Sequence, residues 1–204
     1  MLRFADLVDR LRTGSLGDAM SKLIMWNLLS VDGYFEGGKS WELDWHPYIW
    51  GDELQRFSLE QLRTAERLLF GRITYEGMAA YWQAATGEDA DLMNRLPKVV
   101  FSRTLKRAEW ANTRLVEGDP TGKIEELKRQ GDGNMFVFGS ATLSATLTEH
   151  GLFDEYRLAV APVLLGRGRA LFEPSSSRLK LQLLEARSLS NGGLILRYEP
   201  HRSQ

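Results

Sequence analysis

Two segments of this sequence repeat one design, in which a short apolar run ends at a glycine and small or hydroxyl residues follow. The first spans residues 68–74 (LLFGRIT), and the second spans residues 136–142 (FVFGSAT). Short apolar runs bounded by turn residues are typical of buried strands, and a strand that leads into a helix is half of a βαβ unit. Chains built from such units form parallel sheets covered by helices, so the pattern favours the α/β class.

The rest of the sequence extends this pattern and then changes it. Further strands are predicted at residues 23–29, 98–101, 113–116, 156–160, 180–188 and 194–199. Helices are predicted at residues 52–67 (capped by Asp52), 74–80, 120–129 and 142–150, with a long loop at 34–51 and a polar excursion at 83–91. No long helix separates the last three strands, and Asn191-Gly192 is a hairpin signal. The sequence therefore predicts a mixed sheet, parallel at first and antiparallel at its end, flanked by helices.

The length of the chain bounds its organisation. Its 204 residues suit one substantial domain and are too few for two. Apolar side chains recur at helical spacing within residues 2–12, which predicts a short amphipathic helix. That helix is expected either to pack on the domain's own surface or to form a dimer contact, and residues 13–17 are expected to be a linker. We therefore expect an extension at residues 1–20 and one domain at residues 21–200.

The composition excludes several kinds of site. The sequence has no cysteine, which excludes disulfides, thiol nucleophiles and cysteine-ligated metals and fits the reducing environment of the cytoplasm. His46, His150 and His201 have spacings that suit no metal site, and each is expected to be a surface or capping residue. A net charge of −1 gives no basic field for nucleic acid or an anionic membrane, and no apolar run approaches the ~18 residues of a membrane helix.

The two strand–glycine–helix turns are candidate phosphate sites. A helix N-terminus exposes unpaired N–H groups and a partial positive charge, and glycine lets the backbone approach a ligand closely. Most such turns are only structural, and neither segment matches GxGxxG or GxxxxGK[ST]. Two of them lying close together would nevertheless suit the bridging phosphates of a dinucleotide.

Two arginines near these turns strengthen the phosphate interpretation. Arg72 follows Gly71 directly, and a guanidinium can bind phosphate through two hydrogen bonds. Ser102, Arg103 and Thr104 follow the next predicted strand and could hold a further phosphate, as selection of NADPH over NADH requires. The alternative is that both arginines are solvated surface charges.

Six short motifs then occur in the order and spacing of a known family. They are SVDGY (30–34), GRITYE (71–76), KVVFSRTL (98–105), FGSATL (138–143), GLFDE (151–155) and PVLLGRG (162–168). From about residue 22 to residue 199 the chain resembles the C-terminal reductase domain of bifunctional riboflavin biosynthesis enzymes. The resemblance implies the dihydrofolate-reductase-like fold, in which helices flank a mixed, mostly parallel sheet in three layers and an antiparallel hairpin closes the C-terminal end.

The resemblance also implies NADPH bound at the carboxyl edge of the sheet, a small-molecule substrate and a homodimer. The implied cofactor residues are Gly71, Arg72 and Thr74 at the first phosphate turn, Ser102, Arg103 and Thr104 near the adenosine 2′-phosphate, Gly139, Ser140, Ala141 and Thr142 at the pyrophosphate, and Asn27 and Leu28 at the nicotinamide.

The sequence departs from the family where substrates are held. Riboflavin-pathway reductases carry an acidic, proline-containing segment after the first phosphate turn, whereas residues 75–78 here are YEGM. Dihydrofolate reductases place a carboxylate in their first helix, and the matching position here falls near Gln55. We therefore expect an NADPH-dependent reductase of some small planar heterocycle, pterin-like or pyrimidine-like. The alternative is a non-catalytic NADPH-binding protein on the same fold.

Candidate catalytic and substrate residues lie in three places. Asp32 ends the first strand and could meet the nicotinamide or substrate, although Asp-Gly is also a favoured turn. Glu53 could serve as a proton donor, although an acid in the first turn of a helix also complements the helix dipole. Trp41, Trp45 and Trp50 lie in the long loop and could stack on a flat substrate, or else form a hydrophobic cluster beneath the loop.

Overall fold

The structure, a computed structural model, describes residues 20–172 and 178–201. The amphipathic helix predicted at residues 2–12 and its linker at residues 13–17 lie outside the described residues, so the role of this extension stays a prediction.

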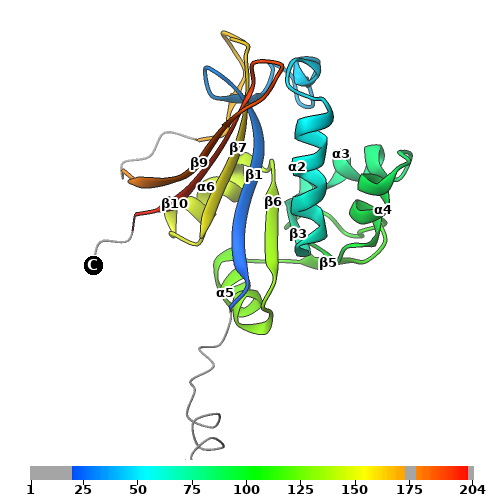
Figure 1. Cartoon of the computed structure of the whole chain (residues 1–204). Coiled ribbons are helices and arrows are strands. Elements are labelled where there is room, and N and C mark those ends of the chain that lie inside the picture. Colours follow the sequence, from blue (N-terminus) through cyan, green and yellow to red (C-terminus); the bar gives the residue numbers. More distant parts are fainter. Residues whose placement is uncertain (1–19, 173–177, 202–204) are drawn as a thin grey trace, which may run out of the picture.

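An eight-stranded sheet forms the centre of the molecule, in the order β5-β4-β3-β6-β1-β7-β10-β9 (Figure 1). Its strands are β1 (Lys22–Ser30), β3 (Ala65–Gly71), β4 (Lys98–Phe101), β5 (Thr113–Val116), β6 (Asn134–Phe138), β7 (Glu155–Ala161), β9 (Leu181–Ser188) and β10 (Leu194–Pro200). The run from β5 to β7 is parallel, and β10 is antiparallel to both β7 and β9. This confirms the predicted mixed sheet with its antiparallel C-terminal pair.

Helices cover both faces of the sheet and complete a three-layer α/β fold. They are α2 (Asp52–Arg63), α3 (Arg72–Trp82), α4 (Glu88–Arg95), α5 (Pro120–Gln130) and α6 (Ala141–Glu149), with a short 3-10 helix η1 (His46–Tyr48). Buried side chains of α2, α3 and α4 belong to one hydrophobic cluster, and those of α5 and α6 belong to a second cluster. A separate two-stranded sheet pairs β2 (Tyr34–Glu36) with β8 (Arg169–Ala170).

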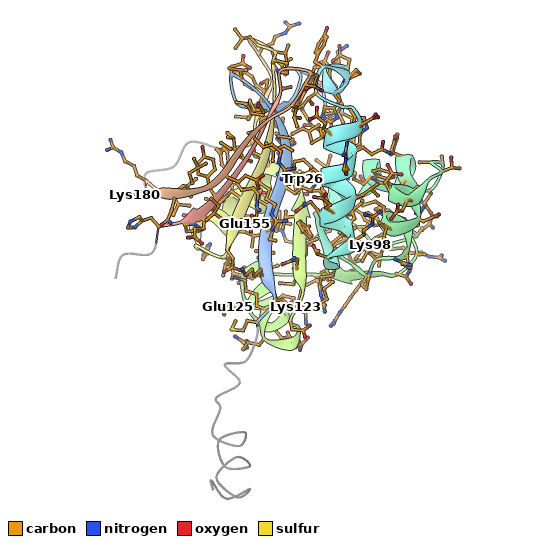
Figure 2. The ribbon with its side chains drawn as sticks, in the orientation of Figure 1. Trp26, Lys98, Lys123, Glu125, Glu155 and Lys180 are labelled. Atoms are coloured by element: carbon orange, nitrogen blue, oxygen red, sulfur yellow. The ribbon has the colours of Figure 1, made fainter. Side chains whose placement is uncertain are left out.

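Alternating side chains of the strands connect the two clusters. In β1, Ile24 and Trp26 join the cluster under α2, whereas Leu23 and Met25 join the cluster under α5 and α6. This is the two-residue period of a strand that is buried on both faces, which is why β1 reads as a continuous apolar run. Trp26 lies near the middle of the molecule, at the centre of the sheet (Figure 2).

Three local predictions were wrong for identifiable reasons. Helix α2 ends at Arg63, not near residue 67, because the backbone from Ala65 pairs with β6. Its N-cap is Gly51, so Asp52 lies inside the first turn and caps nothing. The predicted polar excursion at residues 83–91 overlaps α4. The first turn of this helix carries three acidic side chains that suit the helix dipole but make its sequence look polar.

No helix of the described residues is long and apolar enough to cross a membrane.

Candidate functional site

The carboxyl ends of the parallel strands bring the two predicted phosphate turns together. Gly71, at the end of β3, pairs with Phe101 at the end of β4. Trp26 of β1 pairs with Phe138, which ends β6. Since β6 lies between β3 and β1, both turns open at one sheet edge, where the strand order reverses. Ligands of open α/β sheets bind in this position.

The two turns are bonded directly to each other. The Oγ of Ser140 accepts a hydrogen bond from the N–H of Gly71 at 2.7 Å, and the Oγ1 of Thr74 accepts one from the N–H of Ser140 at 2.9 Å. A Cβ added at Gly139 would lie 3.1 Å from the Cγ2 of Thr74, so a small residue is needed where the turns meet. These hydrogen bonds therefore fix the positions of the two turns relative to each other.

The first turn of α6 retains free donors. Gly139 and Ser140 have φ angles of +52° and +55°, which turns the chain sharply before Ala141 begins the helix. The first intrahelical bond runs from the N–H of Ser144 to the carbonyl of Ser140, so the N–H groups of Ala141 and Thr142 have no partner within the helix. Left-handed backbone at a non-glycine residue is strained, and such strain tends to occur at functional sites.

The basic side chains predicted to hold phosphate differ in their surroundings. Arg72 forms an ion pair with Glu76 (Nη1 to Oε2, 2.8 Å), and both side chains are about half exposed. The hydroxyl of Ser102 accepts hydrogen bonds from the N–H groups of Thr104 (3.1 Å) and Leu105 (2.9 Å), so it stabilises the loop after β4. Arg103 lies exposed in that loop and pairs with no carboxylate of the described residues.

A further cation, which the sequence patterns did not predict, lies at the start of α6. Arg169 in β8 donates from Nη2 to the Oγ1 of Thr142 at 3.2 Å, and its guanidinium lies 5.9 Å from the ring of Phe35. It therefore lies beside the free N–H groups of the α6 first turn. The GRGR run at residues 166–169 was the available signal, but only the β2–β8 pairing places it at this helix.

A cavity of about 660 Å³ opens beside the interlocked turns. Its walls come from the end of β1, the β2 strand and following loop, α2, α3, α4 and the end of β6. The lining residues are Trp26, Asn27, Leu28, Phe35, Glu36, Trp41, Leu43, His46, Pro47, Trp50, Ser58, Leu62, Thr74, Met78, Tyr81, Trp82, Asp89, Met93, Phe138 and Gly139. This volume and aromatic lining are typical of a small-molecule site.

Asn27 joins the cavity to the second turn. Its Oδ1 accepts a hydrogen bond from the N–H of Gly139 at 2.6 Å, and the residue is only 6% exposed. Its Nδ2 is buried and has no hydrogen-bond partner among the described residues. A buried donor without a partner is costly, so a ligand acceptor at this point would be stabilising. A nicotinamide carboxamide has such an acceptor, and the site therefore fits the cofactor that the sequence predicts.

The three loop tryptophans occupy different environments. Trp41 and Trp50 line the cavity, whereas Trp45 is 2% exposed and belongs to the hydrophobic cluster. The backbone of Trp41 has a φ of +64°, and its indole lies so close to Gly77 of α3 that an added Cβ would overlap the ring. Gly77 thus allows Trp41 to close one wall of the cavity.

The Gly77–Trp41 contact is expected to cancel the stabilisation that usually follows when alanine replaces a glycine inside a helix. Alanine in place of a mid-helix glycine normally stabilises by about 0.5–1 kcal/mol. Gly77→Ala is expected to bring no such gain and to shift tryptophan emission, because the indole of Trp41 must move. Gly122→Ala in α5 is the matched control, since nothing lies within 4 Å of its added Cβ. Urea unfolding and fluorescence spectra measure both effects, and equal stabilisation of the two variants with unchanged emission would contradict the expectation.

The two carboxylates predicted as proton donors lie outside the cavity wall. Asp32 accepts hydrogen bonds from the N–H groups of Leu165 (3.2 Å) and Gly166 (2.7 Å), and hydrogen bonding, led by the Ser30 side chain, lowers its pKa. Glu53 accepts from the N–H of Ser190 at 2.7 Å and from its hydroxyl, which lowers the pKa of Glu53. Both are therefore ionised at neutral pH, and the contacts that the structure shows for each hold a loop.

The ionisable groups that do line the cavity are Glu36, Asp89, His46 and Tyr81. Glu36 is 7% exposed, and its Oε1 accepts from the N–H of Trp41 at 3.1 Å. Burial lowers the pKa of His46 to about 4, so its imidazole is neutral at pH 7. It is half-buried at the cavity wall beside the ring of Trp45. No group of three or more potential metal ligands occurs among the described residues.

Comparison with known proteins agrees with this geometry. A family model for the RibD C-terminal domain matches residues 21–195. The uncharacterized protein YyaP of Bacillus subtilis (strain 168) is 28% identical over 186 residues, which cover 87% of this chain and 94% of that protein.

Solved structures share the fold at low identity. A candidate riboflavin biosynthesis protein from Shewanella sp. PV-4 superimposes with a TM-score of 0.73 at 22% identity, covering 89% of this chain and 99% of that one. Acinetobacter baumannii RibD gives a TM-score of 0.67 at 21% identity, covering 97% of this chain and 64% of its own. An Enterococcus faecalis dihydrofolate reductase complexed with NADP(H) gives a TM-score of 0.61 at 13% identity, and the match covers 89% of this chain and 97% of that one. The chain thus has the dihydrofolate-reductase-like fold.

Proposed function

This chain belongs to the family of RibD C-terminal domains, and on that premise we propose that it binds NADPH and transfers hydride to a small planar heterocycle. The observation that carries the proposal is the buried, unpaired Nδ2 of Asn27, a residue that lines the aromatic cavity beside the two interlocked turns. Bound NADPH would supply the hydride, and the protein would supply binding, orientation and exclusion of water.

Each part of the cofactor has candidate partners on this chain. Asn27 would donate from Nδ2 to the carboxamide oxygen of the nicotinamide. The free N–H groups of Ala141 and Thr142, with Arg169 beside them, would hold the pyrophosphate. Arg103 would bind the 2′-phosphate from the loop after β4. The aromatic walls at Trp41 and elsewhere would hold the substrate ring flat against the nicotinamide.

The function is tested by binding and then by turnover. Four tryptophans line the cavity, so NADPH and NADH can be titrated by tryptophan fluorescence. Candidate heterocycles are then screened for NADPH oxidation. Failure of both nucleotides to bind would reject the cofactor assignment. Binding without turnover of any pterin, pyrimidine or flavin precursor would favour the second candidate, a non-catalytic NADPH-binding protein, which the departure at residues 75–78 supports.

Arg103→Ala is expected to weaken NADPH binding and to spare NADH binding. Loss of a charge-assisted hydrogen bond costs about 1–3 kcal/mol, which is roughly a 5- to 150-fold change in Kd. Arg107→Ala is the control, because Arg107 lies in the same loop with its side chain 85% exposed. Fluorescence titration of both variants with both nucleotides measures the difference. Equal losses for NADPH and NADH would refute the assignment of Arg103 to the 2′-phosphate.

We also propose that the protein forms a homodimer. Strand β9 is at the edge of the sheet, and its Leu183 and Leu184 are 52% and 44% exposed. An exposed edge strand with apolar side chains pairs readily with a second copy. The division into residues 1–20 and 21–200 and the cytoplasmic location remain predictions of the sequence.

A further inference from the structure

We propose that the cavity selects flat aromatic ligands that carry N–H donors and are uncharged or positively charged, that the Glu36 carboxylate anchors them, and that phosphorylated ligands are excluded. The inference rests on the proposed function only in treating the cavity as the substrate site. The inferred ligand class differs from the riboflavin-precursor pyrimidine that the family resemblance allowed. It follows from the charges of the side chains that line the cavity.

The cavity walls are acidic. Glu36 and Asp89 are the carboxylates at the wall, and His46 is neutral at pH 7 because burial lowers its pKa to about 4. Among the described residues, no lysine or arginine lines the cavity. A buried phosphate requires cations or many N–H donors, and nearby carboxylates repel it strongly in a low dielectric. A ligand that carries phosphate inside this cavity is therefore disfavoured.

Glu36 has unused hydrogen-bonding capacity. It is the last residue of β2, and β2 is held in place by pairing with β8. Its carboxylate accepts one N–H, that of Trp41 at 3.1 Å, and forms no ion pair with a described residue. A carboxylate has about four acceptor positions, and a residue that is only 7% exposed has little access to water for filling them. A ligand with adjacent N–H donors would satisfy the carboxylate.

The aromatic walls add a preference for flat and positively charged rings. Trp41 is fixed over Gly77, and Trp26, Trp50, Trp82 and Phe138 lie at other walls. Indole faces stack on planar heterocycles and attract cations through their quadrupole. Glu36 holds the backbone of Trp41, so the carboxylate and this ring form one recognition surface.

Cations lie outside the cavity, where the cofactor phosphates are proposed to bind. Arg169 is bonded to Thr142 at the start of α6, and Arg103 lies in the loop after β4. Neither lines the cavity. The site is thus divided into a basic part for phosphates and an acidic, aromatic part for the substrate.

Two matched pairs of probes test the inference on the full chain. 4-Aminoquinoline is a flat cation with N–H donors, and quinoline-4-carboxylate is an anion on the same ring. Riboflavin and FMN differ only in a phosphate. Tryptophan fluorescence titration at pH 7 is expected to give 4-aminoquinoline a Kd at least about tenfold below that of quinoline-4-carboxylate, and riboflavin a lower Kd than FMN. Equal or tighter binding of the anions, or no binding of any probe, would overturn the inference.

The role of Glu36 is tested by Glu36→Gln. This variant is expected to raise the Kd of 4-aminoquinoline by about 10- to 100-fold, the effect of losing a charge-assisted hydrogen bond. The Kd of quinoline-4-carboxylate is expected to stay the same or to fall. Glu42→Gln removes an exposed charge from the same loop and is expected to change neither Kd. If the two variants behave alike, the anchor is not Glu36. The ratio of the probe affinities in the unmodified protein tests the charge preference even if Glu36→Gln does not fold.

Titration with NADPH separates this inference from the proposed function. If NADPH does not bind but the predicted preference among the probes is observed, the cofactor assignment is rejected and the inference about the acidic cavity stands. NADPH binding that discriminates against NADH, together with no probe preference, would reject the inference and keep the cofactor.

Discussion

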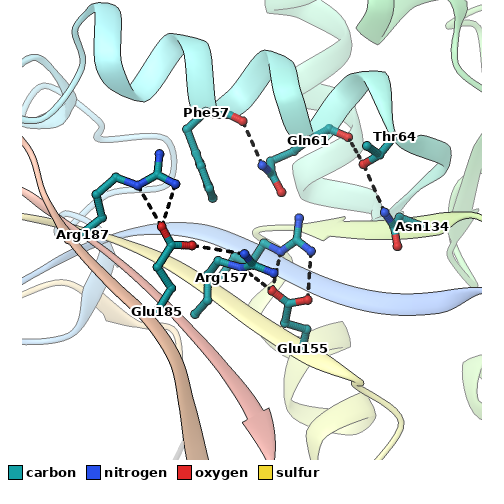
Figure 3. A network of polar contacts seen from close by, with 9 residues as sticks. Phe57, Gln61, Thr64, Asn134, Glu155, Arg157, Glu185 and Arg187 are labelled. Carbon is teal, nitrogen blue, oxygen red and sulfur yellow. Dashed lines mark hydrogen bonds and ion pairs between the residues drawn. The ribbon is translucent and has the colours of Figure 1, made fainter.

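Glu155→Leu is expected to destabilise the protein by about 3–5 kcal/mol, because it leaves a buried arginine without its carboxylate. Oε1 of Glu155 accepts from the Nε of Arg157 and from the Nε of Arg197, each at 2.7 Å, and Oε2 accepts from the Nη2 of Arg157 at 2.9 Å (Figure 3). Glu155 and Arg157 are 5% and 8% exposed. The arginine cannot lose its charge, so its desolvation would be uncompensated.

A neighbouring carboxylate supplies the control for this prediction. Glu185 also pairs with two arginines, Arg187 and Arg197, but its side chain is 26% exposed. Glu185→Leu is therefore expected to cost about 1 kcal/mol or less. Urea unfolding at pH 7 measures both variants, and a loss at Glu155 no larger than that at Glu185 would show that burial of the network contributes little.

The pH dependence of Glu155 has a definite sign. Burial would raise its pKa, but hydrogen bonds from Arg157 and Arg197 outweigh burial and lower it. A carboxylate with a lowered folded pKa contributes its full stability above its unfolded pKa of about 4.3, and that contribution is lost as the pH falls through the folded pKa. The difference in unfolding free energy between the unmodified protein and Glu155→Leu should therefore be largest near neutral pH and shrink below about pH 4.

Lys98→Met is expected to destabilise the protein by about 3 kcal/mol, because three carbonyl groups lose one shared donor. The ammonium of Lys98 donates to the carbonyl oxygens of Asn94 (3.0 Å), Leu96 (2.8 Å) and Ala111 (3.1 Å). It also lies 4.4 Å from the centre of the Trp110 ring, on the α4 side of the sheet (Figure 2). These bonds join the end of α4 to the segment before β5.

Thermal unfolding measures the effect of Lys98→Met. For a protein of this size, about 3 kcal/mol corresponds to a Tm lower by about 6–12 °C. Lys106→Met, in an exposed position of the loop after β4, should change the Tm little. A Tm for Lys98→Met close to that of the control would mean that water replaces the lost donor.

Lys98 also predicts a change of stability in alkali. Burial lowers its pKa to about 8, whereas an unfolded lysine has a pKa of about 10.4. Between these values the unfolded chain binds the proton more strongly, so the contribution of Lys98 to the unfolding free energy rises with pH, by at most about 1.4 kcal/mol per pH unit. The difference between the unmodified protein and Lys98→Met should accordingly grow from pH 8 to pH 10.

Local sequence patterns determined the sheet and its order of elements. The strands predicted at residues 98–101 and 113–116 have these bounds in the structure, and the Asn191-Gly192 signal lies at the turn between β9 and β10. The helix predicted at residues 120–129 begins at Pro120 in the structure, and Asp119 caps it, with its side chain accepting from the N–H of Thr121. Such features depend on side-chain period and turn chemistry, which a few neighbouring residues express. The two strand–glycine–helix turns were visible for the same reason.

Tertiary structure alone decided which side chains form the cavity. Sequence patterns could not separate Trp41, which lines the cavity, from Trp45, which is buried in the core four residues later. Glu36 gave no local signal, and the GRGR run that contains Arg169 did not show which helix it meets, because both residues acquire their surroundings from the β2–β8 pairing. Asn27 meets Gly139 across 112 residues of sequence. The sequence by itself determined where strands end and helices begin, since those are local energies. Which polar groups were left unpaired in the cavity depended on contacts between distant segments, and those exist only once the sheet has formed.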